Sequence, residues 1–343
     1  MENSYTNLKK VHDKNGEIEF DAEIPIAEIE HYIVSVLARA AENFKMPGFR
    51  PGKVPHDVVR KEIGEMALLE DAANDAIRDA VREIIELENL VIVGMPQITV
   101  TKLAPGNPVG LKVRFAIYPE IKLPDYMKIG KAVNDRKAEM EVTEKDVEDG
   151  LDRIKKMFAM GKGADVPPPE INDEFVGKLG PFKTVDEFKA ELKTQLAREK
   201  ELNTMEAKRD ETVREIVKES KLKLPELLVE QELEHYLQDQ ADDLKNANIK
   251  LDDYLKEIGK TAEQFAKEQK TLIEDRIRTG LVLRAIREKE ELKPEERDVQ
   301  MNIAQLKMRY PDRSDDALRE SAEAIAIQKK LFDLLEGKLV EEK

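Results

Sequence analysis

One stretch of the sequence, placed between two segments of helical periodicity, reads Phe44-Lys45-Met46-Pro47-Gly48-Phe49-Arg50-Pro51-Gly52-Lys53-Val54-Pro55. Prolines fix the backbone and glycines free it in turn along this stretch, so the sequence predicts a loop of defined shape. An aromatic side chain and two cations, Phe49, Arg50 and Lys53, project from the predicted loop. Such a tip is suited to contact with another molecule rather than to packing in a core.

The segments on either side of this loop predict a small α+β domain. An Asn15-Gly16 turn between two alternating segments indicates a hairpin within residues 5–25. Apolar residues at three- and four-residue spacing predict helices over 26–41, 56–63 and 65–89. Alternation over 98–103 and 111–117 predicts two more antiparallel strands with one buried face. Residues 1–119 are therefore expected to form a four-stranded antiparallel sheet with helices between its two hairpins.

The rest of the chain is predicted to be almost entirely helical. Residues 120–142 lack a strong period and are expected to run as an extended segment. Thr143 and Asp146 form a capping pattern at the start of an amphipathic helix over 144–159. Residues 120–170 therefore read as a linker, and 171–343 as an elongated all-α domain. Its helices are long and thinly apolar, so a body with protruding arms is expected.

The apolar stripes of these arms have two interpretations. Most of each stripe is expected to pack within the chain. The methionine, leucine and tyrosine residues that remain toward the arm tips are candidates for adaptable contact with varied partners. The candidates are Leu233, Tyr236, Leu237, Met301, Met308, Leu331 and Leu335.

Composition excludes several classes of protein. Charged residues make up 38% of the 343 residues and aromatic residues 5%, which is typical of long solvated helices. The net charge of −15 argues against the wrapping of nucleic acid, so any RNA contact must be local. The absence of cysteine excludes disulfides, thiol catalysis and Cys-ligated zinc. With neither a signal peptide nor an apolar run long enough to span a membrane, a cytoplasmic, soluble protein is expected.

The loop is a basic exception on this acidic chain. Residues 44–62 hold five cations and two carboxylates, a net charge of +3. A basic tip on an acidic protein favours docking to a polyanion or an acidic surface while the rest of the chain is repelled. Composition alone also allows a solvated loop whose cations are incidental, because short basic clusters are common.

Catalytic and nucleotide-binding motifs are missing. The sequence has no glycine-rich phosphate-binding loop, and its four histidines are scattered, without a neighbouring nucleophile or metal-ligand spacing. The carboxylates lie on predicted helix faces beside lysine and arginine, which indicates solvation and ion pairing. The sequence therefore predicts no catalytic residue, no metal site and no cofactor.

Three motifs carry a resemblance to a known family. The run from Gly48 to Pro55 resembles the ribosome-binding signature of bacterial trigger factor, in a loop between helices of an N-terminal α+β domain. Residues 141–147 resemble the family's linker helix, and residues 169–175 resemble the start of its C-terminal helical domain. The resemblance covers nearly the whole chain. It implies that Gly48, Phe49, Arg50, Pro51, Gly52, Lys53 and Pro55 form a ribosome-binding site.

The sequence departs from the family pattern in two places. The family usually has lysine after the signature arginine, whereas this chain has Pro51, so one cation of the tip is lost. The family also carries an FKBP-like prolyl isomerase domain between the linker helix and the C-terminal domain. Here only residues 160–170 separate the two, which is too short for any domain. The isomerase activity associated with the family is therefore predicted to be absent.

The resemblance implies an ATP-independent chaperone that docks at the ribosomal tunnel exit and shelters nascent polypeptides. Its partners would be a ribosomal protein, ribosomal RNA and unfolded chains, with a homodimer possible off the ribosome and no membrane partner. A second hypothesis is a helical adaptor or scaffold protein, whose basic loop serves another acidic partner.

Overall fold

The computed structural model describes residues 4–47, 49, 53–137, 140–160 and 169–339. Its strands are β1 (Thr6–Lys14), β2 (Glu17–Ile24), β3 (Gln97–Lys102) and β4 (Val109–Ala116). Its helices up to the middle of the chain are α1 (Ile26–Asn43), α2 (His56–Ile63), α3 (Glu65–Leu87), α4 (Tyr126–Asn134), α5 (Glu144–Met160) and α6 (Asp173–Leu179). The later helices are α7 (Val185–Glu219), α8 (Glu226–Asn246), α9 (Leu251–Glu257), α10 (Ala262–Lys289), α11 (Glu296–Arg309) and α12 (Asp315–Leu335).

The chain divides into two compact units, each built from two stretches of sequence. The first unit comprises Met1–Lys122 and Lys221–Leu281, and the second comprises Leu123–Ser220 and Val282–Lys343. The boundary between the units falls within α10. The functional division at residues 119 and 170 follows the sequence motifs and remains a prediction.

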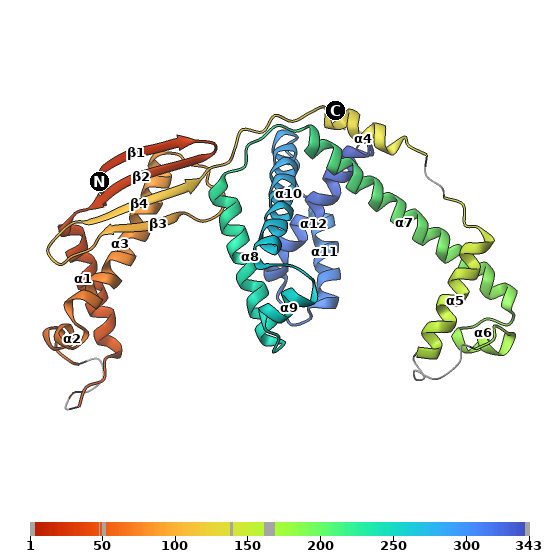
Figure 1. Cartoon of the computed structure of the whole chain (residues 1–343), viewed down its shortest axis with the longest axis horizontal. Helices are drawn as coiled ribbons and strands as arrows, with labels where there is room; N and C mark the ends of the chain where they lie inside the picture. Colours follow the sequence, from red (N-terminus) through yellow and green to blue (C-terminus); the bar gives the residue numbers. More distant parts are fainter. Residues whose placement is uncertain (1–3, 48, 50–52, 138–139, 161–168, 340–343) are drawn as a thin grey trace. The chain divides into compact units, whose positions relative to one another are not determined.

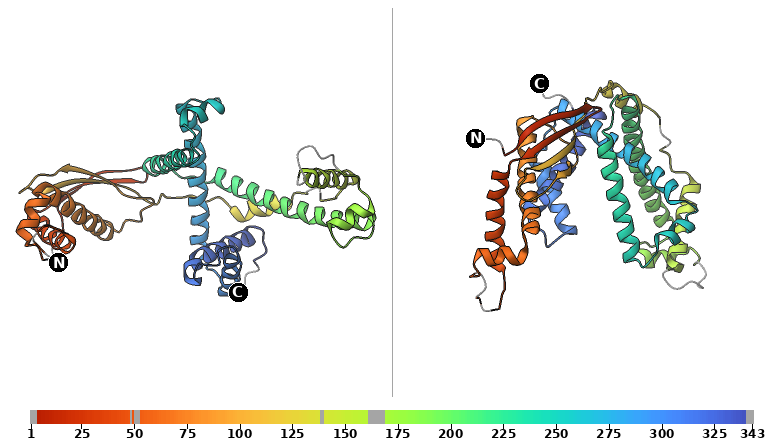
Figure 2. Two further views of the ribbon diagram at one scale, coloured as in Figure 1. Left: turned by 90° about the horizontal axis from the view of Figure 1, so that it is seen from below. Right: turned by 60° about the vertical axis from the view of Figure 1, so that its left-hand side comes forward.

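An antiparallel sheet of four strands forms the centre of the first unit, in the order β1-β2-β4-β3 (Figure 1). The predicted Asn15-Gly16 turn joins β1 to β2, and both residues have positive φ, as a tight hairpin turn requires. Alternate residues of β2 and β4 pack against α1 and α3, which lie on one face of the sheet (Figure 2). Phe20 and Phe115 meet edge to face in this core, with their ring centres 6.1 Å apart.

The predicted burial of the third strand is wrong. Ile98 and Val100 of β3 alternate as a buried strand would, and they pair with Val113 and Leu111 of β4. Both are nevertheless exposed, as is every residue of β3. The alternation correctly predicted the strand, but an edge strand need not lie beneath the helices that cover its neighbours.

The second unit is helical, and it contains a helix that the sequence analysis missed. Residues 120–142 were expected to be extended, whereas α4 forms within them. Asp125 caps α4 by accepting a hydrogen bond from the Lys128 N–H, at 3.1 Å. Tyr126 and Val133 are buried on one side of the helix, at a spacing that two turns allow. The helix is only nine residues long, so its period is too brief to stand out in the sequence.

The predicted capping pattern at the start of α5 is confirmed. Thr143 and Asp146 form the reciprocal capping box of α5, through Thr143 N–H to Asp146 Oδ2 at 2.8 Å and Asp146 N–H to Thr143 Oγ1 at 3.2 Å. Thr184 and Ser314 accept the corresponding hydrogen bonds at the starts of α7 and α12. α7 runs unbroken for 35 residues.

Candidate contact surfaces

The loop after α1 is anchored at its C-terminal end. Val54 is buried in an apolar cluster with Val59 of α2 and Leu68 of α3. Pro55 follows as the N-cap of α2, and its carbonyl accepts hydrogen bonds from Val58 and Val59 N–H at 3.0 and 3.1 Å. These contacts hold the C-terminal end of the loop against the core, at the point where α2 begins.

The described residues of the loop tip point to solvent. Phe49 is 43% exposed, and its N–H donates to the Met46 carbonyl at 3.2 Å, which closes a turn. Lys53 and Pro55 are also exposed, and no carboxylate of the described residues lies within 4 Å of Lys45 or Lys53. The other predicted residues of the signature, Gly48, Arg50, Pro51 and Gly52, lie outside the described residues. Within the described part of the loop, an exposed aromatic side chain and two lysines without a carboxylate partner lie beside the fixed anchor.

Two of the seven apolar candidates on the arms are not at the surface. Leu331 and Leu335 are 1% and 2% exposed, within the buried stripe of α12. The α12 end that bears Leu335 packs closely on α4, where a Cβ added to Gly130 would lie 2.2 Å from the Leu335 carbonyl oxygen. The two leucines therefore hold the second unit together and present no contact surface in this structure.

The other five candidates remain accessible to different degrees. In the first unit, Leu233, Tyr236 and Leu237 of α8 are half-buried. In the second unit, Met301 of α11 is exposed, and Met308 near the end of that helix is 81% exposed. The structure adds exposed apolar residues that are not among these candidates, and these are Met157, Leu202, Ile249, Leu251 and Leu272.

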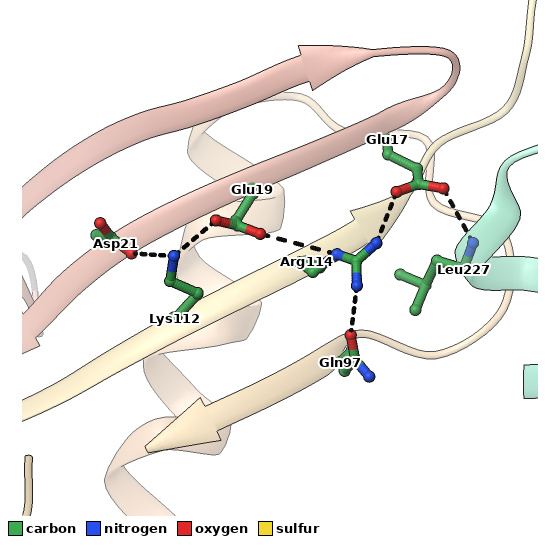
Figure 3. A network of polar contacts seen from close by, with 7 residues as sticks. All are labelled: Glu17, Glu19, Asp21, Gln97, Lys112, Arg114 and Leu227. Carbon is green, nitrogen blue, oxygen red and sulfur yellow. Dashed lines mark hydrogen bonds and ion pairs between the residues drawn. The ribbon is translucent and has the colours of Figure 1, made fainter. Parts of the chain in front are cut away.

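A polar network on the open face of the sheet was not foreseen from the sequence (Figure 3). Glu17 of β2 accepts a hydrogen bond from Arg114 of β4 through one oxygen and from the Leu227 N–H of α8 through the other, both at 2.9 Å. No side chain of α8's own N-terminal segment caps that helix, so Glu17 acts as its cap from 210 residues away.

Further contacts extend this network along the sheet. Arg114 also donates to Gln97 of β3 at 3.1 Å, and Lys112 pairs with Glu19 and Asp21 at 2.8 and 3.5 Å. Burial opposes the ionisation of Glu17, but its bonds from Leu227 and Arg114 outweigh burial and hold its pKa below the ordinary value. The network therefore fastens the start of α8 to the sheet. The sequence analysis assigned no role to Glu17, and nothing in the sequence pointed to α8.

A groove of about 600 Å³ lies between α5 and α7 in the second unit. Its lining carries both signs of charge, with Asp146, Arg153 and Lys200 among its residues. Asp146 is engaged in the α5 capping box, and Lys200 donates to the Glu141 carbonyl at 2.8 Å. Asp146 and Lys200 therefore already have partners within the chain, and the groove is best explained as part of the α5–α7 packing.

The described residues show neither a metal site nor a membrane span. No group of three or more potential metal-ligating side chains gathers among them. None of their helices is both long and apolar enough to cross a bilayer.

Two family models match the chain. The model described as bacterial trigger factor protein matches residues 6–154, and the model of the C-terminus of that protein matches residues 184–342. A trigger factor of Mycolicibacterium vanbaalenii is 23% identical, over 85% of this chain and 79% of its own length. A trigger factor of Agathobacter rectalis is also 23% identical, over 91% of each chain. A solved structure, of a trigger factor chaperone studied for promiscuous substrate recognition, matches with a TM-score of 0.56 and 14% identity, over 97% of this chain and all of its own.

The alignments also contain positions that this chain lacks. The alignment with the Agathobacter rectalis protein is 404 positions long. It includes 91% of this chain, or about 312 of its 343 residues. At roughly 90 positions, the relative therefore has a residue where this chain has a gap. The two family models leave residues 155–183 between them unmatched. No isomerase domain is indicated there. With both family models covering most of its length, the chain belongs to the bacterial trigger factor family.

Proposed function

We propose that this protein is an ATP-independent chaperone, which docks at the ribosomal tunnel exit and shelters nascent polypeptides while they begin to fold. The observation that carries the proposal is the exposed tip of Phe49 and Lys53 beside the anchored Val54, in a chain of the trigger factor family. The cytoplasm is the proposed location, since the ribosome is the proposed dock.

Docking is proposed to rest on charge and on one aromatic contact. Arg50 and Lys53 pair with phosphates of ribosomal RNA or with an acidic side chain of a ribosomal protein. Phe49 either packs into an apolar notch beside them or braces the loop. Pro51 stands where the family usually has lysine, so these two cations carry the charge of the tip.

Client binding is proposed to use scattered apolar side chains without a deep pocket. Leu233, Tyr236 and Leu237 offer half-buried apolar area on α8, and Met301 and Met308 offer flexible side chains on α11. Flexible methionine side chains adapt to partners of different shape. The expected result is weak, promiscuous binding with fast release. Isomerase activity is proposed to be absent, and free protein off the ribosome is proposed to form a homodimer.

Ribosome co-sedimentation tests the docking step. The Phe49→Ala, Arg50→Ala and Lys53→Ala changes together should abolish most of the binding of the full chain, and binding of the wild type should weaken as salt is added. A matched control changes Arg309, Tyr310 and Arg313 to alanine. Like the loop variant, it removes one exposed aromatic side chain and two cations, but at a different place on the surface. Equal binding by the loop variant and the wild type would overturn the docking proposal.

Suppression of aggregation tests the chaperone step. The full chain should slow the aggregation of a chemically denatured enzyme to the same extent with and without ATP. A chain that binds ribosomes but leaves aggregation unchanged would instead support the adaptor hypothesis.

A further inference from the structure

The two edges of the first unit's sheet are built differently. β1 forms one edge and β3 the other (Figure 1). β1 carries Lys9, Lys10 and Lys14, and its pairing with β2 is irregular at two places. Charges and irregular pairing are the means by which proteins keep an edge strand from pairing with other chains. The β1 edge is therefore protected.

The β3 edge lacks that protection along most of its length. The strand reads Gln97-Ile98-Thr99-Val100-Thr101-Lys102, with no charged residue before Lys102. Its pairing with β4 is regular from Gln97 to Val100, and its one irregularity comes after Val100. Ile98 and Val100 are 42% and 43% exposed on the same side of the strand. β-branched residues in such a position favour the addition of a further strand.

The backbone of β3 specifies what kind of partner can bind. Among the described residues, β4 is the one strand that neighbours β3, so the other edge of β3 presents N–H and C=O groups without a strand partner. An extended peptide satisfies such groups in alternation, and its alternate side chains meet those of the receiving strand. Ile98 and Val100 would contact every second side chain of that peptide.

We infer that the β3 edge binds an extended apolar segment of an unfolded polypeptide as a fifth strand of the sheet. This inference rests on the proposed chaperone function and names one site and one conformation of the client. At this edge, charge favours a client over a second copy of this chain, because two copies would each bring a net charge of −15, and the homodimer proposed above is expected to form through another surface. A segment that is neutral or basic meets no such repulsion.

The test uses the full chain and a fluorescein-labelled peptide of alternating valine and threonine with lysine at both ends. Val100→Lys places a cation on the proposed edge and should weaken peptide binding roughly tenfold by anisotropy. Val11→Lys is the matched control, because Val11 is a similarly exposed valine, 47% exposed, on the opposite edge strand. It adds the same charge and should change the affinity by less than about twofold. Equal weakening by both variants, or by neither, would overturn the inference.

Two further measurements distinguish strand addition from contact with side chains alone. The first uses a peptide that is N-methylated at alternate residues, on the edge that would face β3. This peptide keeps its side chains but loses the backbone N–H donors of that edge, so it should bind far more weakly. Amide hydrogen exchange should slow in residues 97–102 when the unmodified peptide is added and stay unchanged in residues 6–14. Full binding of the methylated peptide would overturn the inference.

The outcomes also separate this site from the proposed function and from self-association. If the wild type and the Val100→Lys variant bind the peptide equally while both suppress aggregation, the edge site is wrong and the chaperone proposal stands. If no form suppresses aggregation, the chaperone proposal fails. A dimer in sedimentation that Val100→Lys dissociates, with peptide binding unchanged, would identify a second copy as the occupant and overturn the inference.

Discussion

Glu17 is the residue on which the attachment of α8 to the sheet depends. Its carboxylate accepts hydrogen bonds from Arg114 and Leu227 and is largely shielded from water. Glu17→Ala should lower the free energy of unfolding by about 1–3 kcal/mol, because it leaves a buried N–H and a guanidinium without their acceptor. Urea unfolding followed by circular dichroism measures this loss. Asp21→Ala is the control on the same strand, and its half-exposed ion pair should be worth about 0.5 kcal/mol or less. Equal losses in the two variants would contradict the capping role.

The pH dependence of Glu17 has a definite sign. Because the pKa of Glu17 in the folded protein lies below its ordinary value of 4.5, the stabilisation it supplies is complete above that pH. Below it, the unfolded chain takes up the proton first, and the stabilisation falls until the folded carboxylate is protonated too. The difference in unfolding free energy between the wild type and Glu17→Gln should therefore stay constant near neutral pH and shrink as the pH falls below 4.5. A difference that grows on acidification would contradict the assignment.

At the scale of elements, two helical glycines predict opposite effects of the same substitution. Alanine in place of glycine inside a helix is ordinarily stabilising by about 1 kcal/mol. Gly280 of α10 has no atom within 4 Å of an added Cβ, so Gly280→Ala should raise the melting temperature. Gly130 of α4 lies against the Leu335 carbonyl, so Gly130→Ala should instead cost about 1–3 kcal/mol. Thermal unfolding decides between them, and a stabilising Gly130→Ala would mean that α4 does not approach α12 this closely.

Helices α11 and α12 predict a second contrast, between an exposed and a buried apolar side chain. Leu331→Ala opens a cavity in the stripe of α12 and should cost about 2–5 kcal/mol. Met308→Ala should change stability by less than about 0.5 kcal/mol, because that side chain is exposed. If Met308 serves client binding, its variant should slow aggregation less well at unchanged stability. A loss of stability in the Met308 variant would show that the side chain has a packing role.

The elements that could be predicted from the sequence are those determined by residues close to one another in the chain. Turns and caps that form within one short segment are set by neighbouring residues, so the Asn15-Gly16 hairpin and the Thr143–Asp146 capping box followed from sequence alone. The nine residues of α4 were too few to establish a period against the neighbouring prolines.

Burial depends on what the rest of the fold places nearby, and alternation does not record this. Ile98 was therefore expected to be buried and is exposed, whereas Leu331 was a candidate contact residue and is buried. The hydrogen bond between Glu17 and Leu227 joins residues 210 positions apart, and neither segment contains a sequence pattern that predicts it.

At the scale of the whole molecule, the chain is expected to have no prolyl isomerase activity. The two trigger factor models match its ends, and the segment between the α5 region and α6 is too short for a catalytic domain. A peptidyl-prolyl turnover assay on the full chain should give the uncatalysed rate at every protein concentration tested. Turnover that rises with protein concentration would show that some other part of the chain binds and isomerises proline.

The first unit is built from two stretches of sequence, so during translation its first stretch is made well before its second. The sheet is complete once β4 has been translated, but its cap on α8 must wait until Leu123–Ser220, which belong to the other unit, have been made. During that interval Glu17 and Arg114 bind only each other and their strand neighbours, and Ala116 lacks the leucines of α8 that later cover it. A nascent copy of this protein therefore passes through a stage in which its complete sheet still lacks the contacts with α8, and in this respect it resembles the incompletely folded chains it is proposed to protect.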